Sequence, residues 1–387
     1  MMRYGLVGHY VFAVFSFLAI SFLAWYFFSR CCERKSNRLN RIFITLVVLF
    51  ALCIGYDTLQ FATGVYDSRI GEWLSLLGAA WLFGCVFATV LLMVFAIIWA
   101  VAKVFRCRIG LRLRNTFLVI ALVLYALSLL GMYNGYSRIV VNQQKFYSDK
   151  IQNNKKFRIA YFSDLHLGNV YNIATLERTL AMIAAQKPDV LFIGGDIFDD
   201  EREIVPAINK INQFAEEFAL PIYFVMGNHE YYCNAPKIVE QLALSKVKLL
   251  NNSSAKIAPD ENIYVVGVDY PRYEGGMRFD KKQAELNLAT AFRDVPAPSL
   301  KLLLAHSPEY VEVLNGRKLA DLSISGHTHG GQVELGRLNM FQGKFQYLRG
   351  RYELPNITTI VSVGTGGWLP FRYNCPAEIN IIDIEAK

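Results

Sequence analysis

Five of the six histidines of this 387-residue chain lie in short polar turns that follow runs of β-forming residues, and only His9 lies elsewhere. A single histidine in a turn is usually an ordinary structural or surface residue. Five of them, four of which lie close to a glycine, aspartate or asparagine, indicate a shared chemical role. Together with a turn that contains Asp196, these turns are residues 163–168, 194–196, 227–230, 306–308 and 326–331.

Imidazole and carboxylate groups form a ligand set for Zn, Fe or Mn. No cysteine occurs in the five turns, which argues against a structural zinc site built from thiolates. In Asp164-Leu165-His166 and His327-Thr328-His329, the i, i+2 spacing lets both side chains point the same way from an extended backbone. We therefore expect each pair to hold one ion.

The number of candidate ligands is sufficient for two ions. Only two of the ligands are anionic, so two divalent cations would leave a positive site that attracts phosphate esters. Two such ions about 3.5–4 Å apart can share a hydroxide and stabilise the attacking and leaving oxygens of an in-line displacement. The candidate ligands are Asp164, His166, Asp196, Asn228, His306, His327 and His329.

The turns must be positioned by the elements before them. Short β-rich runs alternate with helical periodicity from residue 157 onward, which predicts a layered α/β domain. Ligands of such domains collect at the carboxyl ends of strands. The expected strands are 157–162, 190–193, 222–225, 263–268, 301–305 and 322–325, and the expected helices are 173–186, 203–218 and 281–293.

The ordered series Asp-x-His, Gly-Gly-Asp, Gly-Asn-His-Glu, a lone His and Gly-His-x-His resembles the calcineurin-like metallophosphoesterase superfamily. Its fuller forms here, such as Ser-Asp-Leu-His-Leu-Gly and Ser-Gly-His-Thr-His-Gly-Gly-Gln, are most similar to the bacterial YkuE/YaeI-type branch. The resemblance covers about residues 156–384. It implies two mixed β-sheets packed face to face, with helices on the outside.

The resemblance also implies a role for each residue. Asp196 would bridge two divalent ions, which would be Mn, Zn or Fe. His229 would contact the phosphate and protonate or steady the leaving oxygen, so the catalytic residues would be His229 and Asp196. The ligands of one ion would be Asp164, His166 and His329, and those of the other Asn228, His306 and His327.

Several neighbouring residues have weaker claims. Asp199 and Asp200 are expected to be a solvated helix start rather than ligands. Glu230 is expected either to orient His229 or to face solvent. The segment 364–367, Gly-Thr-Gly-Gly, lacks the lysine and helix of a phosphate-binding loop and is expected to be a tight turn. Cys233 and Cys375 either pair or remain free thiols.

Four apolar runs precede residue 138, and three of them are long enough to cross a hydrocarbon core of about 30 Å. The second run has only 15 residues before Asp57, and we count it as a span because the stretch beyond Asp57 is mostly apolar. The alternative for the second run is a buried core helix. Polar residues 138–156 are expected to form a stalk between a transmembrane module, residues 1–137, and the domain at 157–387. The expected membrane spans are 10–28, 42–63, 73–102 and 116–137.

The cations are concentrated in the first third of the chain. Residues 1–133 contain 12 Lys or Arg against 4 Asp or Glu, whereas the remainder contains 28 of each, which argues against a nucleic-acid partner. Lysine and arginine fill the loops at 30–41 and 103–114, and such loops stay in the cytoplasm. The domain at 157–387 is therefore expected on the extracytoplasmic side of the cell membrane.

The segment after Gly-His-x-His interleaves aromatic residues with arginines, which suits a membrane interface and a lipid-linked phosphate substrate. The alternative is an ordinary loop whose aromatic residues pack on one another. The candidate substrate-binding residues are Arg337, Phe341, Phe345 and Arg349.

These features predict a membrane-anchored two-metal phosphoesterase that hydrolyses a phosphodiester or a pyrophosphate, with a lipid-linked substrate as one option. The alternative is a non-catalytic metal-binding scaffold, but scaffolds of this kind typically lose ligands, and here all eight positions are filled. A transporter regulated by the domain is a third option, which the charge-free spans disfavour. The absence of Gly-x-Ser-x-Gly gives a serine hydrolase no support.

Overall fold

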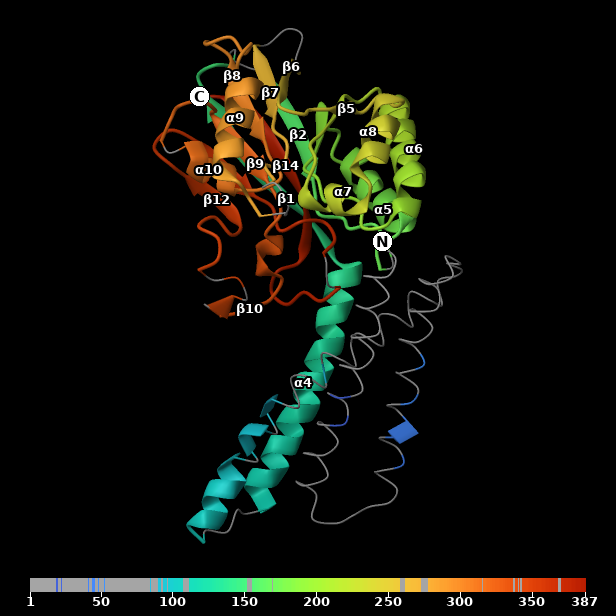
Figure 1. Cartoon of the computed structure of the whole chain (residues 1–387), viewed down its shortest axis with the longest axis vertical. Coiled ribbons are helices and arrows are strands. Elements are labelled where there is room, and N and C mark those ends of the chain that lie inside the picture. Colours follow the sequence, from blue (N-terminus) through green and yellow to red (C-terminus); the bar gives the residue numbers. More distant parts are fainter. Residues whose placement is uncertain are drawn as a thin grey trace. The chain divides into compact units, whose positions relative to one another are not determined.

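The structure is a computed structural model. It describes isolated residues between 19 and 106, and residues 111–387 apart from 152–154, 169, 258–261, 273–277, 315, 337, 340, 342 and 368–369. The chain divides into two compact units, Met1–Tyr133 and Asn134–Lys387. The second unit contains every candidate site residue, and its sheets and helices are labelled in Figure 1.

The first sheet of the second unit has six strands in the order β1-β14-β2-β3-β4-β5. Only the β14–β2 pair is antiparallel. The strands are β1 (Ile139–Ser148), β14 (Ala377–Ala386), β2 (Lys156–Phe162), β3 (Val190–Ile193), β4 (Ile222–Phe224) and β5 (Lys248–Leu249).

The second sheet also has six strands, in the order β12-β13-β9-β8-β7-β6. Its two outer pairs are antiparallel and its inner pairs are parallel. The strands are β12 (Gly350–Glu353), β13 (Thr358–Val361), β9 (Leu322–Ser325), β8 (Leu300–Leu304), β7 (Ile263–Gly267) and β6 (Ser253–Lys256). A separate ribbon pairs β10 (Glu334–Leu335) with β11 (Leu338–Asn339).

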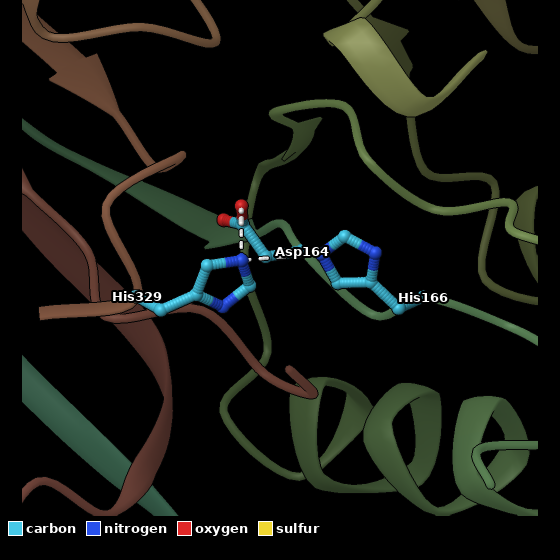
Figure 2. Close-up of side chains that lie close together, drawn as sticks. All are labelled: Asp164, His166 and His329. Atoms are coloured by element: carbon cyan, nitrogen blue, oxygen red, sulfur yellow. Dashed lines mark hydrogen bonds and ion pairs between the residues drawn. The ribbon is translucent and has the colours of Figure 1, made fainter. Parts of the chain in front are cut away.

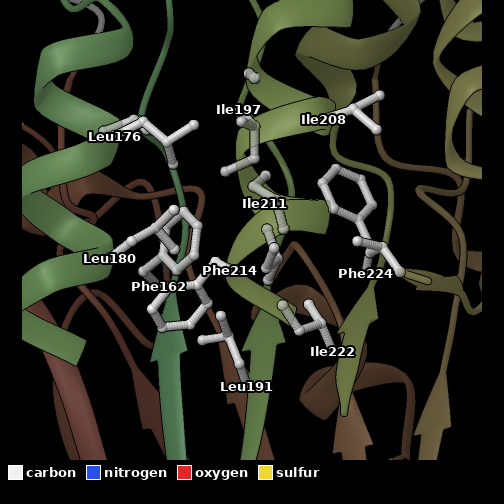
Figure 3. Packing of buried hydrophobic residues seen from close by; sticks show 14 of the residues in the cluster. Phe162, Leu176, Leu180, Leu191, Ile197, Ile208, Ile211, Phe214, Ile222 and Phe224 are labelled. Atoms are coloured by element: carbon white, nitrogen blue, oxygen red, sulfur yellow. The ribbon is translucent and has the colours of Figure 1, made fainter. Parts of the chain in front are cut away.

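Three apolar layers hold the unit together. One fills the space between the sheets, for example with Ile159 of β2 and Leu302 of β8. A second packs the first sheet against helices that include Leu176 and Ile208 (Figure 3), and a third packs the second sheet against α9 and α10. The helices are α5 (Ile173–Ala184), α6 (Glu201–Glu217), α7 (Asn228–Cys233), α8 (Ala235–Ala243), α9 (Lys281–Ala291) and α10 (Glu309–Leu314).

The alternation along β2 explains why one strand serves two layers. Ile159 and Tyr161 face the other sheet, while Ala160 and Phe162 face the helices, because successive side chains of a strand point to opposite faces. The prediction of two mixed sheets with flanking helices is confirmed, and each expected strand and helix has a counterpart.

The predicted stalk is wrong. Residues 139–148 form β1, which pairs with β14 in parallel over its whole length, from Ile139 opposite Ala377 to Ser148 opposite Ala386. The polar residues that suggested a stalk lie on an edge strand, where their side chains reach solvent or partners on β14. Asn142, for example, donates to the carboxylate of Glu378 at 3.1 Å.

The expected transmembrane module lies mostly outside the described residues. This applies to the runs 10–28, 42–63 and 73–102, of which the structure describes only part of the third and isolated residues of the others. The fourth run, 116–137, falls within α4 (Leu111–Ser137). None of the helices in the described part of the chain meets the length and apolarity needed to cross a membrane.

Candidate metal centre

The site lies where five strands end. The turns after β2, β3 and β4 of the first sheet meet the turns after β8 and β9 of the second, and backbone hydrogen bonds lock them together. The amide of Asp164 donates to Gly195 O at 2.9 Å, and the amide of His327 donates to the Asp164 carboxylate at 3.0 Å. Residues more than 160 positions apart in the sequence are thereby fixed around one point.

One cluster consists of Asp164, His166 and His329, all buried (Figure 2). Nε2 of His166 lies 3.2 Å from Nε2 of His329, which in turn lies 3.6 Å from Oδ1 of Asp164. Two imidazole nitrogens at this distance need a shared proton or a cation between them, because lone pairs repel. The Asp164 carboxylate beside them favours a cation.

A second cluster consists of Asp196, His306 and His327. Nε2 of His306 lies 3.1 Å from Oδ2 of Asp196 and 3.1 Å from Nδ1 of His327. Nδ1 of His306 donates to Gly194 O at 2.8 Å. Because Nδ1 carries the proton, Nε2 is the atom that can bind a metal. In the described part of the chain, Oδ1 of Asn228 is buried without a hydrogen-bond partner.

The residues fit a pair of divalent ions. In each cluster, one ligand atom from every member lies within 4.8 Å of the others. The nitrogen and oxygen donors suit Mn, Zn or Fe. The orphaned amide oxygen of Asn228 is an acceptor that a cation would satisfy, since buried polar groups are otherwise paired.

The protonation of the histidines in the clusters depends on their burial and on the charged groups beside them. Burial lowers the pKa of His166 and His306, but Asp199 beside the first and Asp196 beside the second raise both to about 9. Burial lowers the pKa of His327 to about 3, with help from His306. The metal-free site therefore holds protons where cations would bind.

The carboxylates respond in opposite directions. Burial raises the pKa of Asp164 above its ordinary value. Burial alone would also raise the pKa of Asp196, but His306 and the other imidazoles nearby hold it well below its ordinary value. Of these two carboxylates, Asp196 is therefore the one that favours the anionic form.

The expectation of an extended backbone at the two Asp-x-His and His-x-His pairs is wrong. Left-handed φ angles occur at Asp164 (55°), His166 (53°), Asp196 (54°), His327 (71°) and His329 (50°). Such angles are uncommon outside glycine and persist at functional sites where the surroundings enforce them. Asp164 and His166 nevertheless share one cluster, whereas His327 and His329 lie in different clusters, so the second pair does not hold one ion.

Two glycines permit the close approach of the turns. A Cβ at Gly227 would lie 2.2 Å from Oδ1 of Asp196, and one at Gly326 would lie 2.2 Å from Oδ2 of Asp164. Either methyl group would displace a ligand carboxylate. The glycines of Gly-Asn-His-Glu and Gly-His-x-His are therefore required by space rather than by φ.

The interpretation of Asp199 as a solvated helix start covers only part of its role, since its side chain is 34% exposed but contacts two imidazoles. Its Oδ1 accepts from Nδ1 of His166 at 2.9 Å and from Nδ1 of His229 at 2.7 Å. Burial alone would raise the pKa of Asp199, but these imidazoles hold it below its ordinary value. The only signal in the sequence is its position three residues after Asp196, in the same turn. Asp200 does cap α6, by accepting from the amide of Arg202.

Glu230 neither orients His229 nor faces solvent. It is fully buried, and its carboxylate accepts from the amides of Asp196 at 2.8 Å, Ile197 at 2.7 Å and Gly227 at 2.7 Å. One side chain thus ties the turn after β3 to the turn after β4.

The segment 364–367 lies against the first cluster, where the amide of Gly366 donates to Asp164 O at 3.0 Å.

Aromatic rings surround the second cluster. The Phe345 ring lies edge-on to His327 with centroids 5.7 Å apart, and the Phe341 ring lies 6.2 Å from Phe345. The rings of Tyr270 and His327, which lie on different loops, have their centroids 5.8 Å apart. No pattern in the sequence predicts this contact.

The other candidate substrate-binding residues are placed differently. Arg349 is engaged in an ion pair with Glu334, and its second nitrogen donates to Asn374 O at 3.4 Å. Arg337 lies outside the described residues. Cys233 and Cys375 are both free thiols.

Comparisons with known proteins agree with this geometry. Residues 157–331 match the family model described as calcineurin-like phosphoesterase. An uncharacterized metallophosphoesterase of Helicobacter pylori strain J99 is 29% identical over 66% of this chain and 67% of its own. The phosphodiesterase YaeI of Escherichia coli is 25% identical over 65% of this chain and 89% of its own. A Bos taurus protein named transmembrane protein with metallophosphoesterase domain is 31% identical over 59% of this chain and 53% of its own.

Proposed function

We propose that this chain, which carries a calcineurin-like phosphoesterase domain and is a metal-dependent phosphoester hydrolase, uses two ions to cleave a phosphodiester or a pyrophosphate. The observation that carries the proposal is the meeting of two buried clusters, each with a carboxylate and two imidazoles, at one edge of the two sheets. Asn228 completes the second set, and Asp196 is the residue proposed to bridge the two ions.

When bound, the two ions would supply Lewis acid catalysis and activate water for attack on phosphorus. His229 would provide the proton for the leaving oxygen. Its Nδ1 is held by Asp199 and its ring is partly exposed, so Nε2 is the nitrogen available to a substrate. Asp199 would act through His229 and His166, by fixing both rings.

A membrane anchor is the second part of the proposal. It is supported by the four apolar runs before residue 138 and by the name of the Bos taurus relative, of which this chain matches about half the length. The cation-rich loops at 30–41 and 103–114 support an extracytoplasmic position for the catalytic domain.

A lipid-linked phosphate is the proposed substrate class on such an anchor. The half-buried ring of Phe345 beside His327, and that of Phe341 packed on Phe345, support an apolar contact next to the reacting phosphate. Arg337 stays a candidate for phosphate binding. Arg349, which is paired with Glu334, is proposed to shape the loop on which those rings lie.

The test is hydrolysis by the detergent-purified full chain with Mn or Zn, using bis-p-nitrophenyl phosphate, p-nitrophenyl phosphate and a lipid pyrophosphate in parallel. We expect metal-dependent turnover of at least one ester, and its loss in Asp196→Asn with the protein still folded. A folded, metal-loaded protein that hydrolyses none of them would favour the scaffold alternative.

A further inference from the structure

Lys344 is an exposed cation held next to the metal centre by two aromatic rings. Its Nζ lies 4.9 Å from the centroid of Phe341 and 5.2 Å from that of Phe345. Contact with two ring faces restrains a lysine without neutralising it. The amide of Lys344 also donates to Phe341 O at 2.9 Å, which closes the turn that places the side chain.

The aromatic rings also fix the position of the Lys344 ammonium relative to the second cluster. Phe345, over which it lies, contacts the ring of His327. The pKa of His327 is lowered first by burial and then by neighbouring charges, among them that of Lys344. The ammonium therefore lies over a ring that contacts a ligand candidate of the second cluster.

Lys344 differs from the other cations of this loop. Arg349 is paired with Glu334, and Arg351 is paired with Glu353. Lys344 forms no ion pair with any residue that the structure describes. Many surface lysines form no ion pair. Lys344 differs from them because two aromatic rings hold its side chain, and one of these rings contacts a proposed metal ligand.

Charge counting indicates what such a cation would recognise. Two divalent ions bring four positive charges, and the carboxylates of Asp164 and Asp196 remove two. The charge of Asp199 is matched by the proton that His229 is proposed to donate. An activated hydroxide and a singly charged phosphodiester would neutralise the rest. An additional cation at the rim is then matched only by a substrate with a further negative group.

We propose that Lys344 binds an anionic group next to the scissile phosphate, namely the second phosphate of a pyrophosphate. The inference rests on the proposed function of the same site and selects among its substrates. A lysine suits this role because its ammonium can donate up to three charge-assisted hydrogen bonds to phosphate oxygens.

The test measures binding of two ligands that cannot be hydrolysed, methylenediphosphonate and methylphosphonate, to the Mn-loaded full chain in detergent by titration calorimetry. We expect Lys344→Met to reduce the preference for the diphosphonate about tenfold, the size of one hydrogen bond to a charged group. Lys344→Arg should retain most of the preference. Lys318→Met is the matched control, because this exposed lysine precedes β9 and therefore lies at the end of the strand away from the site.

Metal content and circular dichroism of each variant show whether it is folded and loaded. Equal weakening of both ligands, or no change in either, in folded and loaded Lys344→Met would overturn the inference. If the wild-type protein hydrolyses no ester yet the preference for diphosphonate depends on Lys344, the proposed hydrolysis is wrong, while the assignment of Lys344 to the second phosphate of a bound pyrophosphate stands.

Discussion

Asp199 accepts hydrogen bonds from a buried imidazole and from a partly exposed one, so its loss has two separable effects. Asp199→Asn should weaken metal binding roughly 10–100-fold through His166, the usual size of such second partners. His229→Ala should leave the metals bound and lower turnover by ~10² to 10⁴, the range of general acid catalysis. Metal analysis by inductively coupled plasma and steady-state kinetics measure the two effects.

The neighbouring Asp200→Asn is the control for this pair. It changes a cap of α6 and touches neither imidazole, so metal affinity and turnover should stay as in the wild type. Loss of metal in His229→Ala would make His229 a ligand and contradict its assignment as the proton donor.

The imidazoles predict how the metal-free protein responds to pH. His166 and His306 have pKa values near 9 instead of the ordinary 6.5, so the folded chain holds two protons that the unfolded chain has released. Their contribution to stability is complete below pH 6.5 and is lost as the pH rises through about 9. His327, with its pKa near 3, has the opposite effect below pH 6.5.

The chelated protein should therefore have its highest thermal midpoint near pH 6.5, and the midpoint should fall toward pH 9. The metal-loaded protein should lack this fall, because ions replace the protons. Differential scanning fluorimetry with and without chelator makes the comparison. Parallel curves for the two forms would show that His166 and His306 do not exchange protons for metal.

The metal-ligand candidates could be predicted from the sequence because each lies in a turn with a recognisable pattern. Asp199 could not, since nothing local separates it from Asp200, which does cap a helix. What distinguishes the two is the position of His166 and His229, which come from other turns. Lys344 was missed for the same reason, because Phe345 reaches His327 only in the folded chain.

At the scale of elements, the sheet edge formed by β1 and β14 is tied to the metal centre through buried polar groups. The carboxylate of Glu378 on β14 accepts from Asn142 of β1, from Asn380 and from the amide of Val363. The turn after Val363 then bonds to the backbone of Asp164. Glu378, on the strand next to the edge strand β1, thus supports the turn that carries Asp164.

Glu378→Ala would leave these donors without their acceptor, at about 1–3 kcal/mol for each one that stays unpaired. We expect a large loss of stability in urea unfolding and weaker metal binding. Glu385→Ala on the same strand removes only ion pairs with Lys145 and Lys156 and should have a much smaller effect. Equal effects of the two variants would show that the network does not support the site.

The central strands could be predicted because they are short apolar runs followed by turns. β1 could not, because its sequence Ile-Val-Val-Asn-Gln-Gln-Lys-Phe-Tyr-Ser has a polar centre. Its partner β14 lies more than 230 residues later in the chain. Pairing over such a separation is decided by the fold as a whole rather than by local pattern.

If the chain is anchored in the membrane as proposed, the side on which the catalytic domain lies can be tested. With the loops at 30–41 and 103–114 in the cytoplasm, a fusion of alkaline phosphatase after Lys155 should be active, and a cytoplasm-dependent fluorescent protein at the same point should stay dark. A fusion after Arg41 should give the opposite pair of signals. Fluorescence after Lys155 would place the catalytic domain in the cytoplasm.

The last turn of α4 sets where the catalytic unit can be separated from what precedes it. Tyr171 donates to Gly135 O at 3.0 Å, and Arg178 donates to Tyr136 O at 3.1 Å. A chain that starts at Asn134 keeps these bonds and β1, whereas one that starts at Phe157 loses both. We expect only the first to be soluble, folded and able to bind metal after expression.

Gly135 also leaves no room at this junction, since a Cβ there would lie 2.4 Å from Pro370 O. Tyr171 follows the turn that carries His166, and its carbonyl accepts from the amide of Gly168 at 2.7 Å. Tyr171 therefore joins the last turn of α4 to the turn that carries His166, which is a ligand candidate of the first cluster.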